Sequence, residues 1–151
     1  MTFHGPGQLV GYPIVDLGTR PDVIGYLRKL ETVITRAAAE IGVELGSDPS
    51  ATGVWAGDRK VCAIGVRVTR ARVTLHGFAL NCTTDLSWFD AIVPCGLADR
   101  SVTSLSDLAG REVTVEDMAP IVTGRFEDVF GLRLEPAPDG LLPDFSALIS
   151  T

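Results

Sequence analysis

Cysteines are scarce in this sequence, and their positions exclude the commonest uses of the residue. Only three of the 151 residues are cysteines, and no two of them stand in a C-x-x-C spacing. An odd and scattered set argues against a disulfide framework and against a zinc site, so no metal is expected. Unpaired cysteines are typical of a reducing compartment, and we therefore expect the protein to be cytoplasmic.

Long hydrophobic runs and phosphate-binding glycine loops are missing as well. No apolar run approaches the length of a membrane span, and residues 1–6 lack the basic and apolar segments of a signal peptide. There is no loop of the Walker or G-x-G-x-x-G type. We therefore expect no membrane partner, no nucleotide and no other cofactor.

Positive charge is in the minority. The 13 lysines and arginines face 19 carboxylates, a net charge of −6, which argues against a nucleic-acid partner. Residues 59–84 depart from this balance, because they hold no carboxylate. Their basic residues are Arg59, Lys60, Arg67, Arg70 and Arg72. This segment is either a solvated strand surface or a basic face that attracts an acidic protein partner.

The length and hydrophobicity of the chain indicate one globular domain. Hydrophobic residues make up 46% of the sequence and the mean hydropathy is +0.26, which excludes a disordered chain. We assign residues 1–136 to the domain and residues 137–151 to a tail.

Hydrophobic periodicity predicts two long helices. One covers residues 21–41, with Pro21 at its first position and Gly42 as its stop. The other covers residues 115–130 and has Thr114 and Asp117 in capping-box spacing, with a kink expected at Pro120.

Strand patterns fill most of the remaining chain. A strand pair, or a strand with a bulge, is expected within residues 2–17, and residues 59–68 read as a central strand because both faces are apolar. Further strands are predicted at 52–56, 73–82 and 132–135, and a short helix at 85–90. These elements indicate an α+β fold with a mainly antiparallel mixed sheet flanked by helices.

Cys95 is the first candidate for chemistry. It lies between Pro94 and Gly96 at the end of an apolar run, where a sharp turn would present its sulfur at a cleft. The alternative is a small buried hydrophobic residue in a tight turn. Cys62 and Cys82 lie within apolar strands, and we expect both to be inert.

Lys60 is the second candidate, and the chain has one other lysine, Lys29. Lys29 lies on the polar side of an amphipathic helix, whereas Lys60 opens an apolar strand. A partly desolvated amine would have a lowered pKa, would act as a base and would favour a nearby thiolate. The alternative is a surface lysine whose stem covers apolar atoms.

Each of the two histidines precedes a glycine, at His4-Gly5 and His76-Gly77. The glycines allow a close approach of the backbone to a ligand. Either histidine could instead be a hydrogen-bonded core residue, or the partner of a cysteine in a hydrolase.

Four blocks of sequence together resemble the octanoyltransferases of lipoate biosynthesis. They are His4-Gly5-Pro6-Gly7-Gln8-Leu9-Val10 with Tyr12-Pro13, Lys60 with Ala63-Ile64-Gly65, His76-Gly77-Phe78-Ala79-Leu80-Asn81, and Pro94-Cys95-Gly96. The blocks occur in the family's order, and the resemblance runs from Thr2 to about Pro136.

The resemblance implies the fold of biotin and lipoate protein ligases and a transfer without ATP. An octanoyl group would move from octanoyl-acyl carrier protein to a lysine of lipoyl domains, in 2-oxoacid dehydrogenases and the glycine cleavage protein. Cys95 would be the nucleophile that carries the acyl group as a thioester, and Lys60 would lower its pKa.

The remaining site residues are implied by the same resemblance. The acyl-pocket backbone would be Ala63, Ile64, Gly65, Gly77, Phe78 and Ala79. A further substrate-binding block would end in Thr2, Phe3 and His4.

One departure from the family concerns the start of the chain. The family has an Arg-Gly-Gly block and several further elements before the Thr-Phe-His segment, where this chain begins with Met1. We therefore expect the native protein to be longer. Two rival functions remain, an inactive acyl-binding remnant of the family and a cysteine-dependent thioesterase-like hydrolase.

Overall fold

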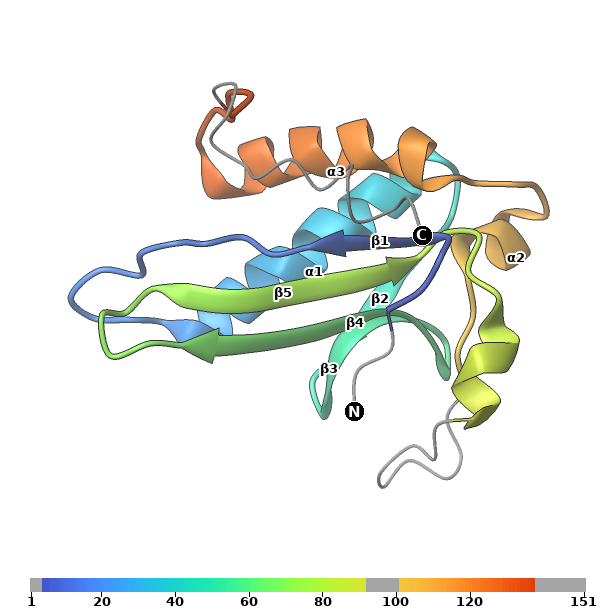
Figure 1. Cartoon of the computed structure of the whole chain (residues 1–151), viewed down its shortest axis with the longest axis horizontal. Coiled ribbons are helices and arrows are strands. Elements are labelled where there is room, and N and C mark those ends of the chain that lie inside the picture. The colour runs from blue at the N-terminus through green and yellow to red at the C-terminus, as the bar shows by residue number, and fades with distance from the viewer. Residues whose placement is uncertain (1–3, 92–100, 138–151) are drawn as a thin grey trace, which may run out of the picture.

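One antiparallel sheet forms the centre of the structure (Figure 1). The computed structural model describes residues 4–91 and 101–137. Within them the strands are β1 (Gln8–Gly11), β2 (Gly46–Asp48), β3 (Ala51–Ala56), β4 (Arg59–Val68) and β5 (Thr74–Asn81). They lie in the order β1-β5-β4-β3-β2, and every neighbouring pair is antiparallel. The predicted α+β class and the central place of β4 are confirmed.

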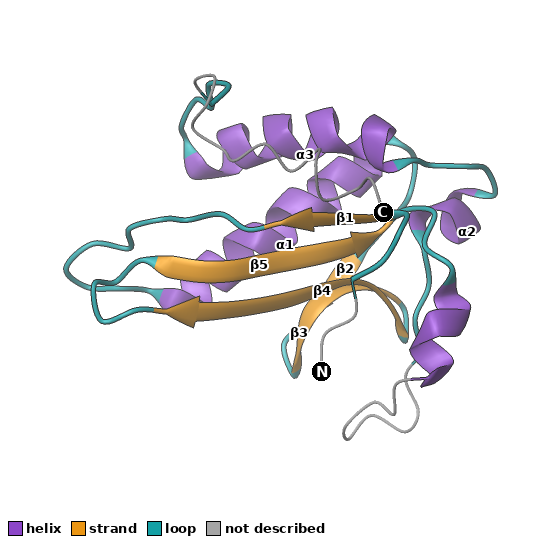
Figure 2. Cartoon of the chain, in the orientation of Figure 1, coloured by secondary structure: helices purple, strands orange, loops and turns teal. Residues whose placement is uncertain are grey.

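The two long helices, α1 (Val23–Glu40) and α3 (Val115–Phe130), lie on one face of this sheet (Figure 2). The other described helices are α2 (Leu105–Ala109) and the 3-10 helix η1 (Leu86–Ala91). The long helix α1 packs on β3, β4 and β5, and α3 packs beside α1 and against β1. Neither of these long helices covers the opposite face of the sheet, the open face. No helix within the described ranges is long and apolar enough to span a membrane.

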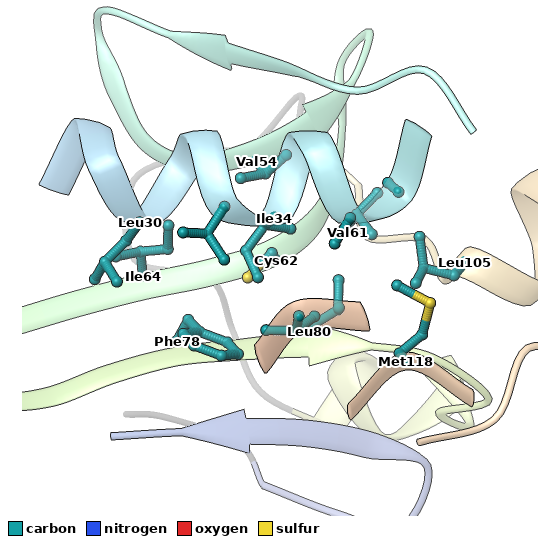
Figure 3. Packing of buried hydrophobic residues seen from close by; sticks show 14 of the residues in the cluster. Leu30, Ile34, Val54, Val61, Cys62, Ile64, Phe78, Leu80, Leu105 and Met118 are labelled. Carbon is teal, nitrogen blue, oxygen red and sulfur yellow. The ribbon is translucent and has the colours of Figure 1, made fainter. Parts of the chain in front are cut away.

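The core lies between α1 and the sheet (Figure 3). Leu30 and Ile34 of α1 are fully buried and face Ile64 of β4 and Phe78 and Leu80 of β5. Side chains alternate between the two faces of a strand, so this packing directs Ala63, Gly65 and Ala79 to the open face.

Both predicted long helices are confirmed, with small differences at their ends. Helix α1 starts at Val23 because the Asp22 side chain accepts a hydrogen bond from the Gly25 amide, so Pro21 precedes the cap and is not the first helical residue. Helix α3 has the predicted capping box of Thr114 and Asp117 and continues through Pro120.

Several sequence predictions differ from the structure. The strand predicted at 132–135 is wrong, because the Leu134 amide donates to the Glu127 carboxylate and the segment follows α3 instead of the sheet. Within residues 4–17 the structure has one strand, β1 (Gln8–Gly11), and an isolated antiparallel bridge between Asp16 and Val73, so of the two alternatives the strand pair is wrong and an interrupted strand is found. The predicted short helix at 85–90 is the 3-10 helix η1. The elements β2 and α2 were not predicted, since both are too short for a periodic pattern.

Candidate functional site

A hollow of about 580 Å³ lies over the open face of β4 and β5. Four consecutive residues of β4 and four of β5 line it, together with two residues from the first part of the chain. The lining is His4, Tyr12, Ala63, Ile64, Gly65, Val66, His76, Gly77, Phe78 and Ala79. The structure thus brings together seven of the predicted substrate-binding residues, His4 among them.

The floor of the hollow consists of small residues in two cross-strand pairs. Ala63 pairs with Ala79, and Gly65 pairs with Gly77. Ile64 and Phe78 line the hollow through their main chain, because their side chains belong to the core on the other face. A shallow apolar floor without bulky side chains leaves room for an extended hydrocarbon chain.

The paired glycines of the floor have different surroundings. A Cβ atom added to Gly65 would meet no atom within 4 Å, so this position opens into free space. A Cβ atom added to Gly77 would overlap the Gly11 carbonyl oxygen and lie 2.8 Å from Cδ of Pro13. Gly77 therefore permits the close approach of the chain that follows β1, as expected for a glycine beside a binding site.

A bulge in β4 determines which face Lys60 occupies. Val54 pairs with Cys62 but Trp55 pairs with Lys60, so Val61 is an extra residue on β4. An extra residue reverses the alternation beyond it. Lys60 therefore lies opposite Trp55, on the face away from the side chains of Val54 and Cys62, which are in the core. Without the bulge Lys60 would point into the core.

The Lys60 side chain is half-buried and lies against an aromatic ring. Its Nζ is 4.5 Å from the centroid of the Trp55 ring, which is the geometry of a cation–π contact. A Cβ atom on Gly53 would stand 3.3 Å from Cε of Lys60, so the absence of a side chain at Gly53 leaves room for the lysine stem. Lys60 is outside the hollow, three residues before Ala63 on the same strand.

The main chain of Lys60 pairs with the segment that follows the Cys95 region. The Lys60 amide donates to the Ser101 carbonyl at 2.9 Å, and the Thr103 amide donates to the Lys60 carbonyl at 2.9 Å. Lys60 and Val102 thus form a parallel bridge. Residues 101–103, which follow Cys95 in the sequence, are therefore bound to β4 at Lys60, the residue predicted to lower the pKa of Cys95.

A buried carboxylate supports the bulge from the helix side. Glu31 of α1 is 2% exposed, and its Oε1 accepts a hydrogen bond of 3.2 Å from the Gly53 amide. Its Oε2 accepts one of 2.7 Å from Arg28. This pairing satisfies a charge that would otherwise be costly to bury, and it holds the strand against which Lys60 lies.

His4 and Tyr12 are hydrogen-bonded at one wall of the hollow. The distance from His4 Nε2 to the Tyr12 hydroxyl is 2.7 Å, and that from His4 Nδ1 to Oε1 of Gln8 is 3.0 Å. The Tyr12 ring also meets the His76 ring edge-on, with centroids 6.1 Å apart. His76 has a φ of 66°, an unusual left-handed conformation for a residue with a side chain.

Cys62 and Cys82, which the sequence predicts to be inert, are both fully buried. Burial raises the pKa of the Cys62 thiol far above its usual range and that of Cys82 to about 11. Neither thiol is ionised at neutral pH, so neither suits nucleophilic chemistry. In the described ranges no group of three histidine, cysteine, aspartate or glutamate side chains could hold a metal ion.

Three predicted site residues, Thr2, Phe3 and Cys95, lie outside the described residues, as does most of the predicted tail. Sequence reasoning also missed residues that the structure brings to the site. Trp55 contacts Lys60, and Tyr12 contacts His4. Tyr12 belongs to a block of the resemblance, whereas nothing in the sequence around Trp55 indicates a contact with Lys60.

Comparisons with known proteins agree with this picture. The family described as "Lipoyl protein ligase A/B catalytic domain" matches residues 1–127. The chain is 51% identical over 133 residues to the octanoyltransferase of Acidothermus cellulolyticus, an alignment that covers 85% of this chain and 60% of that protein. It is 49% identical over 146 residues to the octanoyltransferase of Mycobacterium tuberculosis, covering 95% and 60%. The chain thus spans about 60% of the length of these relatives.

Solved structures show the same fold. The biotin protein ligase of Aquifex aeolicus superposes with a TM-score of 0.66 at 15% identity, over 83% of this chain and 53% of that one. A bipartite lipoate protein ligase of Thermoplasma acidophilum superposes with a TM-score of 0.65 at 15% identity, over 83% and 51%. The predicted fold of biotin and lipoate protein ligases is confirmed.

Proposed function

Because this chain belongs to the lipoyl protein ligase A/B catalytic domain family, we propose that it transfers octanoyl groups, with Cys95 as the nucleophile and Lys60 as its base. The observation that carries the proposal is the apolar hollow on the open face of β4 and β5. Its lining unites the Ala63–Gly65 and Gly77–Ala79 blocks of the octanoyltransferase resemblance, and relatives about 50% identical are octanoyltransferases.

The anchoring of Lys60 supports its pairing with Cys95. Ser101, six residues after Cys95 in sequence, pairs with the Lys60 main chain. Covalent geometry therefore keeps the Cα atom of Cys95 within about 20 Å of that of Ser101. With Cys62 and Cys82 buried as un-ionised thiols, Cys95 is the cysteine left for nucleophilic chemistry.

In the first half of the reaction the acyl group moves to the enzyme. Lys60 takes the proton of the Cys95 thiol, and the thiolate attacks the carbonyl carbon of the octanoyl thioester. A new C–S bond forms to Cys95, and the bond to the carrier sulfur breaks. The departing thiolate receives the proton from Lys60, while the octanoyl chain lies along the floor of the hollow.

In the second half the ε-amine of an acceptor lysine attacks the Cys95 thioester. The amide forms, the C–S bond breaks, and the proton released by the amine returns to the Cys95 sulfur. No ATP is consumed, because the donor is already an activated thioester. The protein substrates we propose are octanoyl-acyl carrier protein and the lipoyl domains of 2-oxoacid dehydrogenases and the glycine cleavage protein, in the cytoplasm.

Mass spectrometry of the chain after incubation with octanoyl-acyl carrier protein tests the covalent step. We expect one octanoyl group on wild type, on Cys62→Ala and on Cys82→Ala, and none on Cys95→Ala. Equal acylation of Cys95→Ala would end the covalent mechanism. Release of free octanoate without an acceptor would indicate a thioesterase, and no acylation of any form would indicate an inactive remnant.

The two lysines provide a matched pair for the proposed base. Each ammonium lies over an aromatic ring, that of Lys29 at 5.3 Å from the centroid of Phe130 and that of Lys60 at 4.5 Å from Trp55. We expect Lys60→Met to slow acylation of Cys95 at least about a hundredfold, the scale of general base catalysis, and Lys29→Met to leave the rate unchanged. Equal rates for the two variants would remove Lys60 from the mechanism.

A further inference from the structure

A chain of side-chain hydrogen bonds runs from the wall of the hollow to the strand of Lys60. Tyr12 bonds His4 at 2.7 Å, and His4 bonds Oε1 of Gln8 at 3.0 Å. Nε2 of Gln8 donates to Oδ1 of Asn81 at 3.0 Å, and Nδ2 of Asn81 donates to the Thr103 carbonyl at 3.0 Å. Thr103 is the residue whose amide bonds the Lys60 carbonyl.

The Thr103 carbonyl determines which group donates and which accepts in every hydrogen bond of this chain. A main-chain carbonyl only accepts, so Asn81 presents its amide nitrogen there and its oxygen to Gln8. Gln8 then presents its nitrogen to Asn81 and its oxygen to His4, and the His4 Nδ1 must donate. In a neutral imidazole the other nitrogen has no hydrogen. His4 Nε2 therefore accepts, and the Tyr12 hydroxyl donates to it.

Burial of Asn81 and Thr103 stabilises this arrangement of donors and acceptors. Asn81 is 4% exposed and Thr103 is 1% exposed, and Gln8 is half-buried. An unpaired amide at Asn81 would cost about 1–3 kcal/mol, which opposes any reversal of the chain. His4 and Tyr12 are more exposed, and their donor and acceptor roles are determined by these buried groups.

We propose that Gln8 and Asn81 are positioning residues that hold the Tyr12 oxygen as a hydrogen-bond acceptor at the hollow. Because the Tyr12 proton is committed to His4, the lone pairs of that oxygen are what Tyr12 offers to a bound molecule. Its ligand is thus a hydrogen-bond donor, and in the proposed reaction the donors near the end of the alkyl chain are N–H groups. This inference rests on the proposed function for its substrate, although its first test does not require activity.

The chemistry of an N–H donor fits two groups in the proposed reaction. One is an amide in the thiol arm of the acyl carrier, and the other is the amine of the acceptor lysine. Both would reach the hollow next to the reacting carbonyl. The shared feature is the N–H, so simple alkyl compounds that differ only in this group can distinguish them.

The first test reads the His4 tautomer by nitrogen NMR, at a pH where both imidazoles are neutral. The chain has only two histidines, so His76 serves as the internal reference. We expect the Nδ1–H form at His4 in wild type and in Gln8→Glu, which keeps an acceptor. In Gln8→Met the Nε2–H form should return. An Nε2–H tautomer at His4 in wild type would overturn the proposal.

The second test measures dissociation constants for N-octylacetamide, octylamine and octyl acetate, which differ at the polar end. We expect wild type to bind one of the N–H compounds about three- to tenfold more tightly than octyl acetate, the value of one hydrogen bond. A preference for the amide indicates the carrier arm, and one for the amine indicates the acceptor lysine. Binding of all three with equal affinity would overturn the proposal.

A double-mutant cycle separates positioning from a general structural effect. Tyr12→Phe should remove the preference for the N–H compound, and Gln8→Met should remove most of it. The double variant should be no worse than Tyr12→Phe alone, because Gln8 acts through Tyr12. Losses that multiply in the double variant would show that Gln8 does not act on Tyr12. Because no step requires catalysis, an inactive chain would refute the proposed function and leave this inference standing.

Discussion

Gly65 and Gly77 face each other across β4 and β5, yet each serves the hollow in its own way. Gly65 leaves free space above the floor, whereas Gly77 admits the main chain of Gly11. One glycine therefore contributes volume for a substrate, and the other allows a neighbouring segment to form a wall. The hollow therefore depends on the absence of a side chain at both positions.

Substitutions at the two glycines should separate binding from folding. Gly65→Val should leave the melting temperature within a few degrees and lower acylation by octanoyl relative to butanoyl thioesters about tenfold, because its methyl groups occupy the path of the chain. Gly77→Ala should lower the free energy of unfolding by about 1–3 kcal/mol, as expected for overpacking. A Gly65→Val protein that keeps its octanoyl preference would place the acyl chain elsewhere.

The Cys82 thiol makes stability depend on pH in the alkaline range. Burial raises its pKa from 9.0 to about 11 in the folded chain, so the unfolded chain loses the proton first. The resulting contribution is fully present below about pH 9 and is lost as pH rises toward 11. A shift of about two pKa units limits this contribution to about 2.7 kcal/mol at most.

Urea unfolding of wild type and Cys82→Ala at pH 8 and about pH 11 measures this contribution. The excess stability of wild type over the variant should shrink at the higher pH, because groups common to both proteins cancel in the difference. A constant difference would mean that the Cys82 thiol is not shielded from solvent in the folded state.

The bulge between β3 and β4 is the element that matters most for the proposed mechanism. Val61 is the extra residue, Gly53 makes space for the Lys60 stem, and Glu31 fixes the Gly53 amide from the helix side. The helix layer thus supports a residue on the far face of the sheet. A carboxylate of α1 and the bulge in β4 together position the Lys60 amine.

A pair of glycine variants tests the bulge. Gly53 has a φ of 132°, and a Cβ atom there would lie 2.7 Å from the Cys62 carbonyl oxygen, whereas Gly57 has a φ of 63° with nothing nearby. Gly57→Ala should cost about 1 kcal/mol of unfolding free energy and leave the acylation rate unchanged. Gly53→Ala should cost more and also slow acylation of Cys95, since it displaces Lys60. Unchanged acylation in Gly53→Ala would separate the bulge from the chemistry.

At the scale of the whole molecule, an acidic protein carries an exposed basic group at one end of its sheet. Arg67 lies near the end of β4, and Arg70 and Arg72 lie in the turn that leads to β5. All three are exposed, at the end of the strands that form the hollow. These arginines would attract an acidic carrier or acceptor domain, and they would take no part in the chemical step themselves.

Charge removal at this group should alter association rather than catalysis. The triple variant Arg67→Gln, Arg70→Gln, Arg72→Gln should lower kcat/KM for the protein substrates and weaken its dependence on salt, with kcat unchanged. Arg36→Gln is the control, because Arg36 is exposed on α1, on the opposite face. An unchanged salt dependence in the triple variant would leave these arginines as ordinary solvated charges.

Local pattern was sufficient for the two long helices, the central strand and the motif blocks. Helical periodicity, a capping box and a strand that is apolar on both faces are properties of neighbouring residues, so the sequence by itself determined α1, α3 and β4. The same holds for the family blocks, which contain all of the residues that line the hollow except Val66.

Only the tertiary structure decided which face these residues occupy and what they meet. The side of β4 on which Lys60 lies depends on a register shift against β3, which a single strand does not encode. His4 reaches the hollow because β1 pairs with β5, about seventy residues later in the chain. The short elements β2 and α2 are held by pairing and by the Ser104 cap, so their own sequences are too brief to predict them.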